Sequence, residues 1–511
     1  MGQSLTIALF TLATTAPTRS LPSTTDLETR IDAALAAAAR FMIDTQSPDG
    51  AWRSQTYGCF RHDPALTPLV LSSLGPLAAE NDEIRSALGK GISYLIGMVG
   101  EDGAFKPTGS NPWAFPVYTA AMASWVVTMD SPTEQHLRAQ RAWLDYLRAR
   151  RLGSGLGWRL SDPQFGGWGY ATAIPRRVES ASEAGTPFGS NLSATLFGLA
   201  ALRFGRVPSD DPVYDEILIF VERCQNFSQD PQRSDAAFDD GGFFFSTTDA
   251  ACNKAGIAGT DRLGRTRFRS YGSATADGLR ALLLCGLDYD HPQVITARKW
   301  LERNFVAGTN PGIFVGDRKV LQDATYYYYC WSVAHALMAL NIDEIETDTG
   351  PVQWAQALAT ELLDRQRPDG SWANRFTDAK EDDPLVASPF AAAALAICRR
   401  MLPDDDSGRA SSQGIQPCKG DRVSQRSVLA LKSACNTIGP TNDPVRTYST
   451  PSNTPNKVSA GTTCGCGVSP APACTAPKIA AVDTTQSQRL RIRFSRQVCT
   501  TPRKKHSSAT G

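Results

Sequence analysis

The sequence has few histidines, no long apolar run and no strong net charge. Only five of its 511 residues are histidine, which argues against a histidine-rich metal centre: His62, His136, His291, His335 and His506. No stretch approaches the ~20 apolar residues of a membrane helix, so we expect no transmembrane segment. The net charge of the whole chain is +1, and we expect no nucleic-acid partner.

The near-neutral total hides an uneven distribution of charge. From Ser407 onward there are 15 Lys and Arg but only 3 Asp, whereas residues 1–406 carry 37 basic and 48 acidic residues. Ser, Thr, Pro and Gly dominate the C-terminal stretch, and no helical period persists in it. We therefore predict a disordered basic tail over 403–511. An incorrectly translated reading frame would produce the same abrupt change of composition.

Residues 1–26 resemble a leader segment. The apolar run Leu5–Ala13 is followed by small and polar residues, as in the core of a signal peptide. No Lys or Arg precedes this run, so the charged start of a signal peptide is missing. The sequence leaves both export and a cytoplasmic location open.

A seven-residue motif occurs twice in the chain. Residues 46–52 read Q-S-P-D-G-A-W, and residues 366–372 read Q-R-P-D-G-S-W. Looser echoes place an aromatic residue just after a glycine, so that six aromatic markers follow one another: Trp52, Phe105, Trp168, Phe244, Phe314 and Trp372. Each marker lies between two helical stretches, which predicts six helix–turn–helix units. Glycine supplies the positive φ of each turn, the aromatic ring fills the gap between hairpins, and Gln hydrogen-bonds the loop.

The predicted helices are of two kinds. The first helix of each pair is amphipathic, and we place these helices near 27–45, 83–98, 133–150, 212–226, 292–305 and 352–367. The second is apolar on nearly all sides, and we place these near 64–74, 117–127, 192–202, 273–284, 329–340 and 389–398. Because a helix that is apolar all round must be enclosed, we predict two concentric rings around a central cavity. The fold class is all-α, an α/α toroid of six helical hairpins over 27–402. An open solenoid has the same alternation, but the matching terminal repeats favour closure.

The Q-x-P-D-G-x-W motif after an amphipathic helix resembles the repeat of squalene and oxidosqualene cyclases. Protein prenyltransferase β subunits share the repeat in looser form. The resemblance to this terpenoid cyclase and prenyltransferase superfamily covers about 27–402 and implies an α/α toroid. It also implies a cavity whose aromatic side chains stabilise isoprenoid carbocations. An apolar small-molecule ligand is the expected partner, and the oligomeric state is left open.

The catalytic signatures of these families are incomplete. No D-x-D-D acid motif is present, since Lys380 stands before Glu381-Asp382-Asp383 where the first Asp is needed. Asp277 matches the zinc-ligating Asp of prenyltransferases, but Leu279 replaces the Cys and Tyr326–Tyr329 replaces the His. One ligand of three cannot hold a catalytic zinc ion. We therefore expect no metal site and no cofactor.

Two carboxyl groups remain as candidate catalytic acids, Asp277 and Asp63. Asp277 interrupts an apolar helix, where burial raises the pKa of a carboxyl group, and Asp63 precedes the first inner helix. The alternatives are an ion pair of Asp277 with Arg269 or Arg280 and helix capping by Asp63.

Four further residues are candidates for substrate binding: Tyr326, Tyr329, Arg267 and Arg269. The two tyrosines share one helix face and could line the cavity, or they could form an aromatic packing belt. The arginines could meet an anionic group at the cavity mouth, or they could be solvated.

The sequence therefore leaves two candidate functions. The protein is a cyclase-like enzyme acting on an isoprenoid, or it is a non-catalytic toroid that serves as a binding or scaffold domain.

Overall fold

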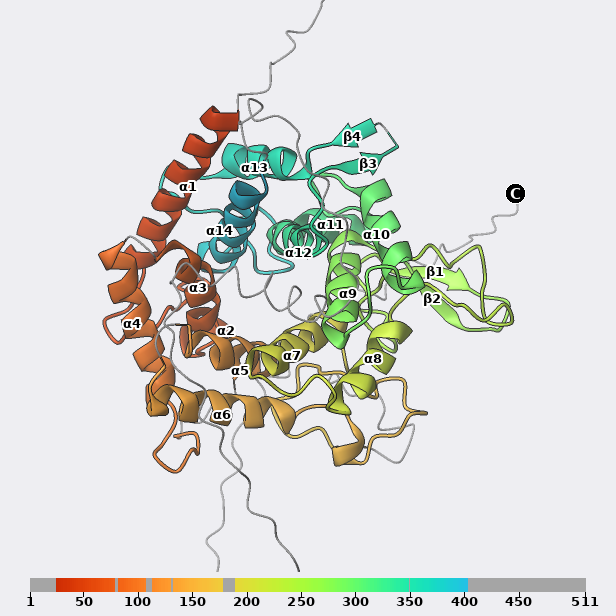
Figure 1. Cartoon of the computed structure of the whole chain (residues 1–511), viewed down its shortest axis with the longest axis horizontal. Helices are drawn as coiled ribbons and strands as arrows, with labels where there is room; N and C mark the ends of the chain where they lie inside the picture. The colour runs from red at the N-terminus through yellow and green to blue at the C-terminus, as the bar shows by residue number, and fades with distance from the viewer. Residues whose placement is uncertain are drawn as a thin grey trace, which may run out of the picture. The chain divides into compact units, whose positions relative to one another are not determined.

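Six apolar helices form a closed inner ring (Figure 1). The computed structural model describes residues 24–78, 81–106, 113–129, 132–177, 189–348 and 350–402. The inner helices are α3 (Leu66–Leu74), α5 (Pro116–Val126), α7 (Leu192–Phe204), α9 (Gly272–Cys285), α12 (Tyr326–Ala339) and α14 (Pro384–Met401). Each contacts the next one along the chain, and α14 packs against α3. The predicted α/α toroid is therefore confirmed, and its ring is closed rather than open.

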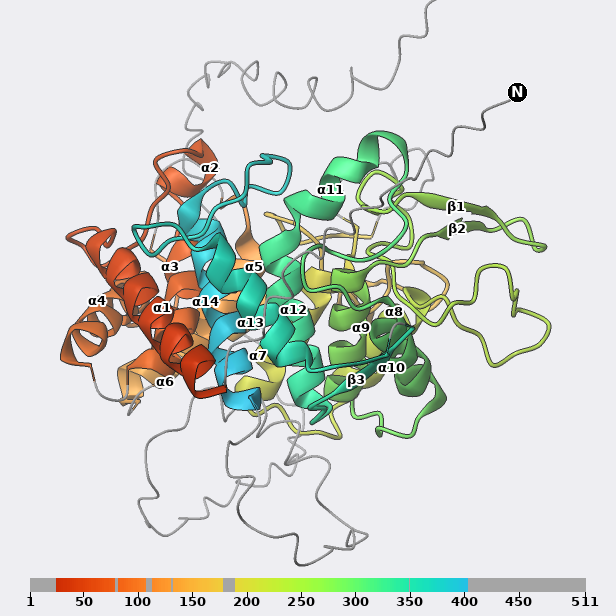
Figure 2. The same cartoon turned by 90° about the horizontal axis from the view of Figure 1, so that it is seen from above.

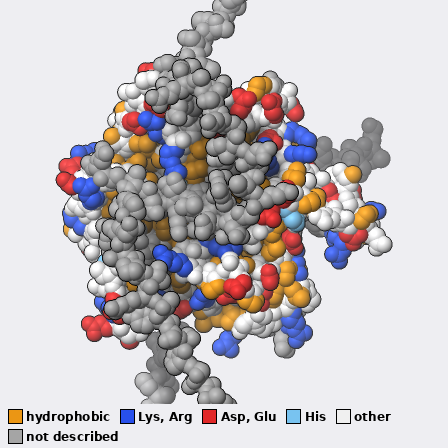
Figure 3. Space-filling model, in the orientation of Figure 1, with side chains coloured by type: hydrophobic (Ala, Val, Ile, Leu, Met, Phe, Trp, Pro, Cys, Tyr) orange, Lys and Arg blue, Asp and Glu red, His pale blue; other side chains and the backbone are white. Residues whose placement is uncertain are grey.

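The amphipathic helices form the outer layer. They are α1 (Thr24–Asp44), α4 (Asp82–Gly97), α6 (Glu134–Arg148), α8 (Val213–Arg223), α10 (Pro292–Asn304) and α13 (Trp354–Arg365). Their charged faces point outward, and acidic and basic side chains are interspersed on the face shown in Figure 3. One ion pair, Arg40 to Glu83 at 2.6 Å, joins α1 to α4, but both side chains are more than half exposed. A surface ion pair of this kind contributes little to the stability of the fold, about 0–1 kcal/mol.

Short elements connect the hairpins. They are the helices α2 (Gly58–Arg61) and α11 (Lys319–Ala324) and two antiparallel strand pairs, β1 (Ile257–Thr260) with β2 (Thr266–Phe268) and β3 (Ile345–Thr347) with β4 (Gly350–Val352). Figure 2 shows the β1–β2 pair projecting away from the ring. No helix among the described residues is both long and apolar enough to cross a bilayer. The predicted tail and most of the predicted leader lie outside the described residues.

The repeated motif links neighbouring hairpins. The Gln46 side-chain amide donates to the carbonyl oxygens of Gly50 and of Ala87 on α4, both at 2.9 Å. Gln366 does the same with Gly370 at 2.9 Å and with Ala34 of α1 at 2.8 Å. The second copy therefore carries the link that joins the last hairpin to the first.

A third copy of this arrangement lies in the middle of the chain, where the sequence motif is broken. Gln225 donates to the carbonyl oxygens of Gly241 at 3.0 Å and of Gln293 on α10 at 2.9 Å. The aromatic residue that follows is Phe243, whose backbone N–H donates to the Thr275 hydroxyl at 3.0 Å, as Trp52 donates to Thr67 at 3.1 Å. The predicted marker Phe244 is thus one residue too late.

The marker tryptophans are part of the core. Trp52, Trp168 and Trp372 are fully buried. Each indole N–H donates to the carbonyl oxygen of a preceding outer helix, at 2.6 Å to Met42, 2.8 Å to Leu147 and 2.7 Å to Leu362. Removing a buried ring of this size typically costs about 3–5 kcal/mol. The repeats therefore stabilise the toroid, as predicted from the sequence.

Candidate functional site

A cavity of about 300 Å³ lies between the inner helices. All six inner helices contribute to its lining, mostly through their C-terminal halves, as with Trp125 of α5, Phe204 of α7 and Ile397 of α14. Because the helices line the cavity mostly with the same end, the six inner helices run parallel to one another. Asp32 and Leu35 of α1 complete the wall.

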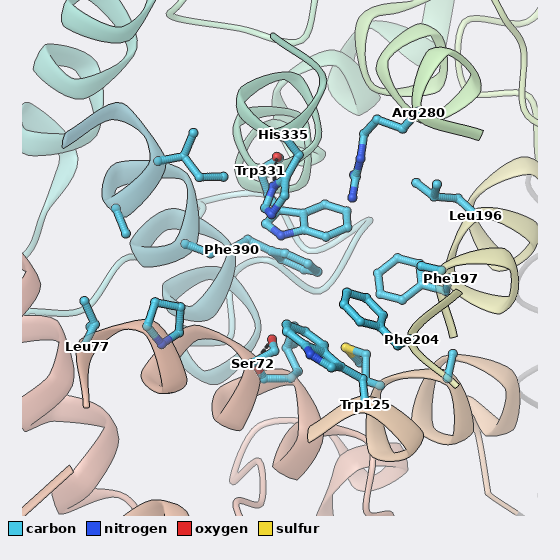
Figure 4. A pocket seen from close by; sticks show the side chains of 18 of the residues that line it. Ser72, Leu77, Trp125, Leu196, Phe197, Phe204, Arg280, Trp331, His335 and Phe390 are labelled. Atoms are coloured by element: carbon cyan, nitrogen blue, oxygen red, sulfur yellow. Dashed lines mark hydrogen bonds between the residues drawn. The ribbon is translucent and has the colours of Figure 1, made fainter. Parts of the chain in front are cut away.

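Aromatic rings form much of this wall (Figure 4). Trp125 and Phe204 are stacked with ring centroids 4.9 Å apart and planes at 14°. Phe197 and Trp331 are also stacked, with centroids 5.4 Å apart and planes at 22°. Phe390 lies against Trp331 at 5.6 Å. A wall of aromatic faces suits an apolar ligand and, through the ring quadrupoles, a cation.

Four basic side chains also line the cavity: Arg280, His335, Arg399 and Arg400. The Arg280 guanidinium points from α9 into the cavity and lies over the Trp331 ring, 4.5 Å from its centroid (Figure 4). His335 Nδ1 donates to the Trp331 carbonyl oxygen at 2.8 Å, since a carbonyl can only accept. Burial first, and then the nearby Arg280 charge, lower the pKa of His335 to about 3, so its ring is neutral.

Asp277 lies one helical turn before Arg280 on α9. Its carboxyl group accepts hydrogen bonds from the Tyr328 hydroxyl at 2.8 Å and from the Ser332 hydroxyl, both on α12. Burial raises the pKa of Asp277 to about 6, although Arg280, the two hydroxyls and Lys254 act in the opposite direction. The side chain is buried but is not among the residues that line the cavity. It links two inner helices, α9 and α12.

Asp63 has a different environment from Asp277. Its carboxylate accepts from the backbone N–H of Ala65 at 2.8 Å and from that of Ala114, which belongs to the next hairpin. Burial raises the pKa of Asp63, and these backbone hydrogen bonds lower it. The arrangement is that of a capping group, which was the structural alternative to a catalytic role, and Asp63 does not line the cavity.

Tyr326 and Tyr329 face away from the cavity. The Tyr326 hydroxyl donates to the Ala307 carbonyl at 3.0 Å, and the Tyr329 hydroxyl donates to the Val306 carbonyl at 3.1 Å. Both carbonyls follow outer helix α10. As a correction to the sequence interpretation, the tyrosine pair forms an aromatic packing belt, because it lies on the outer face of α12.

Arg267 and Arg269 belong to the β1–β2 region rather than to the cavity mouth. Arg267 forms ion pairs with Asp239 at 2.6 Å and with Asp261 at 3.3 Å, and it borders a separate groove of about 920 Å³. The Arg269 backbone N–H donates to Gly256 at 3.0 Å. Neither side chain lines the cavity, which corrects their predicted placement.

Asp277 forms no ion pair with Arg269 or Arg280 among the described residues, although Arg280 is close enough to lower its pKa.

The sequence interpretation missed the inward face of α12. Tyr328, Trp331 and His335 follow one another at helical spacing, and Ser332 lies beside them. The signal was present, because Ser332 and His335 are polar residues in an otherwise apolar helix. Arg280 carried a similar signal in α9, which has apolar or small residues on either side of it.

Glu381 holds the N-terminus of α12. Its two carboxyl oxygens accept from the backbone N–H groups of Tyr327 and Tyr328, both at 2.9 Å. Burial raises the pKa of Glu381 to about 7, against these hydrogen bonds. Because α12 carries Trp331 and His335 of the cavity wall, this buried carboxyl group helps to fix the position of the wall. The described residues contain no group of three or more His, Cys, Asp or Glu side chains that could hold a metal ion.

No protein-family model matches this sequence, and no curated protein is significantly similar to it. Several solved structures resemble the fold. The apo type II terpene cyclase MstE from Scytonema aligns with a TM-score of 0.41 and 14% identity over 73% of this chain and 99% of its own. Cellobiose 2-epimerase from Spirochaeta thermophila aligns with a TM-score of 0.46 and 14% identity over 75% and 98% of the two chains. The α-1,6-mannanase from a Salegentibacter species aligns with a TM-score of 0.42 and 12% identity over 72% and 98%. A cyclase, an epimerase and a mannanase do not distinguish between functions.

Proposed function

We propose that the toroid binds an apolar small molecule of the isoprenoid type in the cavity between its inner helices. The observation that carries the proposal is the aromatic wall around a space of about 300 Å³. This volume is at the lower end of the range for ligand pockets, roughly 300–1,000 Å³. An unsaturated, methyl-branched chain fits such a wall because its double bonds and methyl groups pack against aromatic faces. The sequence resemblance to squalene cyclases points to the same class of ligand.

Calorimetric titration with methyl geranate, a neutral ten-carbon isoprenoid ester, tests this proposal. The variant Ala393→Phe places a ring in the cavity, because Ala393 lines it on α14. We expect wild-type protein to bind the ester and the variant to lose binding while it remains folded. Ala36→Phe is the matched control, because it makes the same change on an exposed position of outer helix α1. Equal binding by wild type and Ala393→Phe would place the ligand elsewhere.

Acid-catalysed cyclisation is the second candidate. It is favoured by Asp277, whose pKa is raised by burial to about 6, so that the carboxyl group is in part protonated near neutrality. The proton would pass from Asp277 to an alkene carbon, whose π electrons form the new C–H bond. A second double bond would then attack the resulting cation, and loss of a proton to water would complete the cyclisation.

Binding ranks ahead of catalysis for two reasons. Asp277 is buried and is not among the residues that line the cavity, so a ligand bound there would not touch it directly. The Arg280 guanidinium points into the same space, where a fixed positive charge opposes a carbocation.

Incubation with squalene and with geranylgeranyl diphosphate, followed by product analysis, tests the catalytic candidate. We would then expect Asp277→Asn to abolish turnover and Asp63→Asn to reduce it only through stability. An absence of turnover by the wild type, together with methyl geranate binding, would leave the non-catalytic binding function.

A further inference from the structure

Arg280 is a buried cation without a hydrogen-bonding partner. Its side chain is 6% exposed and lines the cavity. A guanidinium group carries five N–H donors, yet Arg280 makes no hydrogen bond and no ion pair among the described residues. Its Nη1 atom is fully enclosed and unsatisfied. Burial lowers the pKa of Arg280, but an arginine stays charged in proteins.

The neighbours of Arg280 compensate its charge only in part. The Trp331 ring offers its face at 4.5 Å. Asp277 is near on the same helix, but its two oxygens accept from Tyr328 and Ser332 rather than from the guanidinium. By contrast Arg399, which also lines the cavity, is paired with Glu28 at 2.8 Å and with Asp32 at 3.0 Å. A buried charge without a partner is costly, so an anion that entered the cavity would gain the pairing that Arg280 lacks.

His335, which also lines the cavity, does not supply a second positive charge beside Arg280. His335 donates its Nδ1 hydrogen to the Trp331 carbonyl at 2.8 Å, so its Nε2 atom is an acceptor. Of the three arginines that line the cavity, Arg399 is paired and Arg400 also has a partner, so Arg280 is the planar cationic donor group left unpaired among the described residues. A carboxylate matches the guanidinium fork in both shape and charge. A single carboxylate is enough to neutralise the unpaired guanidinium of Arg280.

We propose that the ligand of the cavity is a monocarboxylic acid, whose carboxylate pairs with Arg280 and whose apolar chain lies against the rings of Trp125, Phe197 and Phe204. The inference rests on the proposed binding function and specifies its ligand class. Arg280 is then the residue that selects for an acidic head group, and the aromatic wall selects for the apolar chain.

The test compares two ligands that differ only at the head group, a carboxylate in one and its uncharged methyl ester in the other. Full-length protein is titrated in a calorimeter with geranic acid and with methyl geranate, which share the same ten-carbon chain. We expect wild type to bind the acid at least roughly tenfold more tightly, which corresponds to about 1.4 kcal/mol. In Arg280→Met this preference should disappear, because the affinity for the acid should fall to that for the ester. Arg280→Lys keeps the charge and should retain a weaker preference.

A matched control removes the same charge elsewhere. Arg298→Met acts on exposed outer helix α10 and should leave the preference unchanged. Arg280 has no hydrogen-bonded partner that the substitution would leave unsatisfied, so Arg280→Met should melt close to wild type. If the variant does not fold, the relative affinities of wild type and of Arg280→Lys for acid and ester still decide the question.

The outcomes separate the two proposals. Equal affinity of wild type for acid and ester, or an acid preference that persists in Arg280→Met, would overturn the inference and leave the binding function intact. Tighter binding of geranyl diphosphate than of geranic acid would also overturn it, in favour of a phosphate head group. Binding of none of these probes would overturn the proposed function and the inference with it.

Discussion

Gln366 and Ala34 join the last hairpin of the ring to the first, through a hydrogen bond of 2.8 Å from the side-chain amide to the carbonyl oxygen. The same amide hydrogen-bonds its own loop at Gly370, at 2.9 Å. Gln46 makes the corresponding pair of bonds between the first and second hairpins. Closure of the ring therefore uses the same contact as an ordinary step between neighbouring hairpins.

Replacing either glutamine with leucine should destabilise the toroid to a similar extent. Gln366→Leu leaves two carbonyl groups without their donor, and an unsatisfied buried group costs about 1–3 kcal/mol. Gln46→Leu removes the equivalent bonds and is the matched control. Urea unfolding of both variants measures the effect. If Gln366→Leu were neutral while Gln46→Leu were destabilising, the first and last hairpins would not be joined in solution.

The glycine of the same motif is predicted to tolerate no side chain. Gly370 has a φ of +84°, and a Cβ atom at this position would lie 2.4 Å from the Ala37 carbonyl oxygen. Gly103 has a similar φ of +79° with no atom within 4 Å of the same position. Gly103→Ala should therefore lower the free energy of unfolding only by the penalty for holding alanine in a left-handed conformation, about 1–2 kcal/mol. Gly370→Ala should cost distinctly more in the same unfolding assay, because two backbones must also move apart. Equal losses would mean that the hairpins are not in close contact there.

The stability of the protein should depend on pH through Asp277. Burial raises the pKa of Asp277 from its ordinary 3.8 to about 6. The folded state therefore binds more protons than the unfolded state between these values, and this contribution to stability is lost as the pH rises from about 4 to about 6. The shift corresponds to about 3 kcal/mol. Asp277→Asn has no such group, so its stability relative to wild type should increase by up to that amount between pH 4 and pH 7.5.

Comparing the two proteins across pH isolates this contribution. Glu381 also has a raised pKa, about 7, but it is present in both and cancels in the difference. The altered hydrogen bonds of the variant shift the difference by a constant amount and leave its dependence on pH unchanged. Chemical denaturation at a series of pH values gives the curve. A difference that is flat with pH would show that Asp277 is solvated in solution.

The sequence predicts the toroid well because the features that build it are periodic and local. Amphipathic and apolar helices alternate, and all twelve lie within a few residues of their predicted ranges. The Gln, Gly and Trp positions of residues 46–52 and 366–372 also indicate the contacts that they make. The link at Gln225 was hidden, because the chain between Gln225 and Gly241 is longer than in the other copies and breaks the motif.

The candidate site was predicted only in part, because its geometry depends on helix rotation. Asp277 was recognised as a carboxyl group in an apolar helix, and it is buried as expected. Which face of α12 points inward cannot be read from four consecutive tyrosines. The predicted pair, Tyr326 and Tyr329, lies on the outer face instead. The capping group of α12, Glu381, lies more than fifty residues along the chain, and no local pattern indicates such a contact.

Glu381 should be more important for stability than an ordinary acidic residue at a helix start. It accepts from the second and third backbone N–H groups of α12, those of Tyr327 and Tyr328, both at 2.9 Å. Its side chain is buried, so water cannot take its place without reorganisation of the loop. Glu381→Ala therefore leaves two buried backbone N–H groups without an acceptor, and each should lower the free energy of unfolding by about 1–3 kcal/mol. Glu381→Gln keeps one carbonyl oxygen as an acceptor and should lose less stability.

Glu134 provides the comparison, because it lies in the first turn of α6 and is exposed. There an acidic residue contributes only through the helix dipole, about 0.3–1 kcal/mol, so Glu134→Ala should have a small effect. The order of unfolding free energies at pH 7 is thus expected to be Glu134→Ala, then Glu381→Gln, then Glu381→Ala, from most to least stable. Since α12 carries Trp331 and His335 of the cavity wall, Glu381→Ala should also weaken methyl geranate binding, whereas Glu134→Ala should not. If Glu381→Ala were as stable as Glu134→Ala and bound the ester normally, other groups would satisfy the first turn of α12 and the cavity wall would not depend on this carboxyl group.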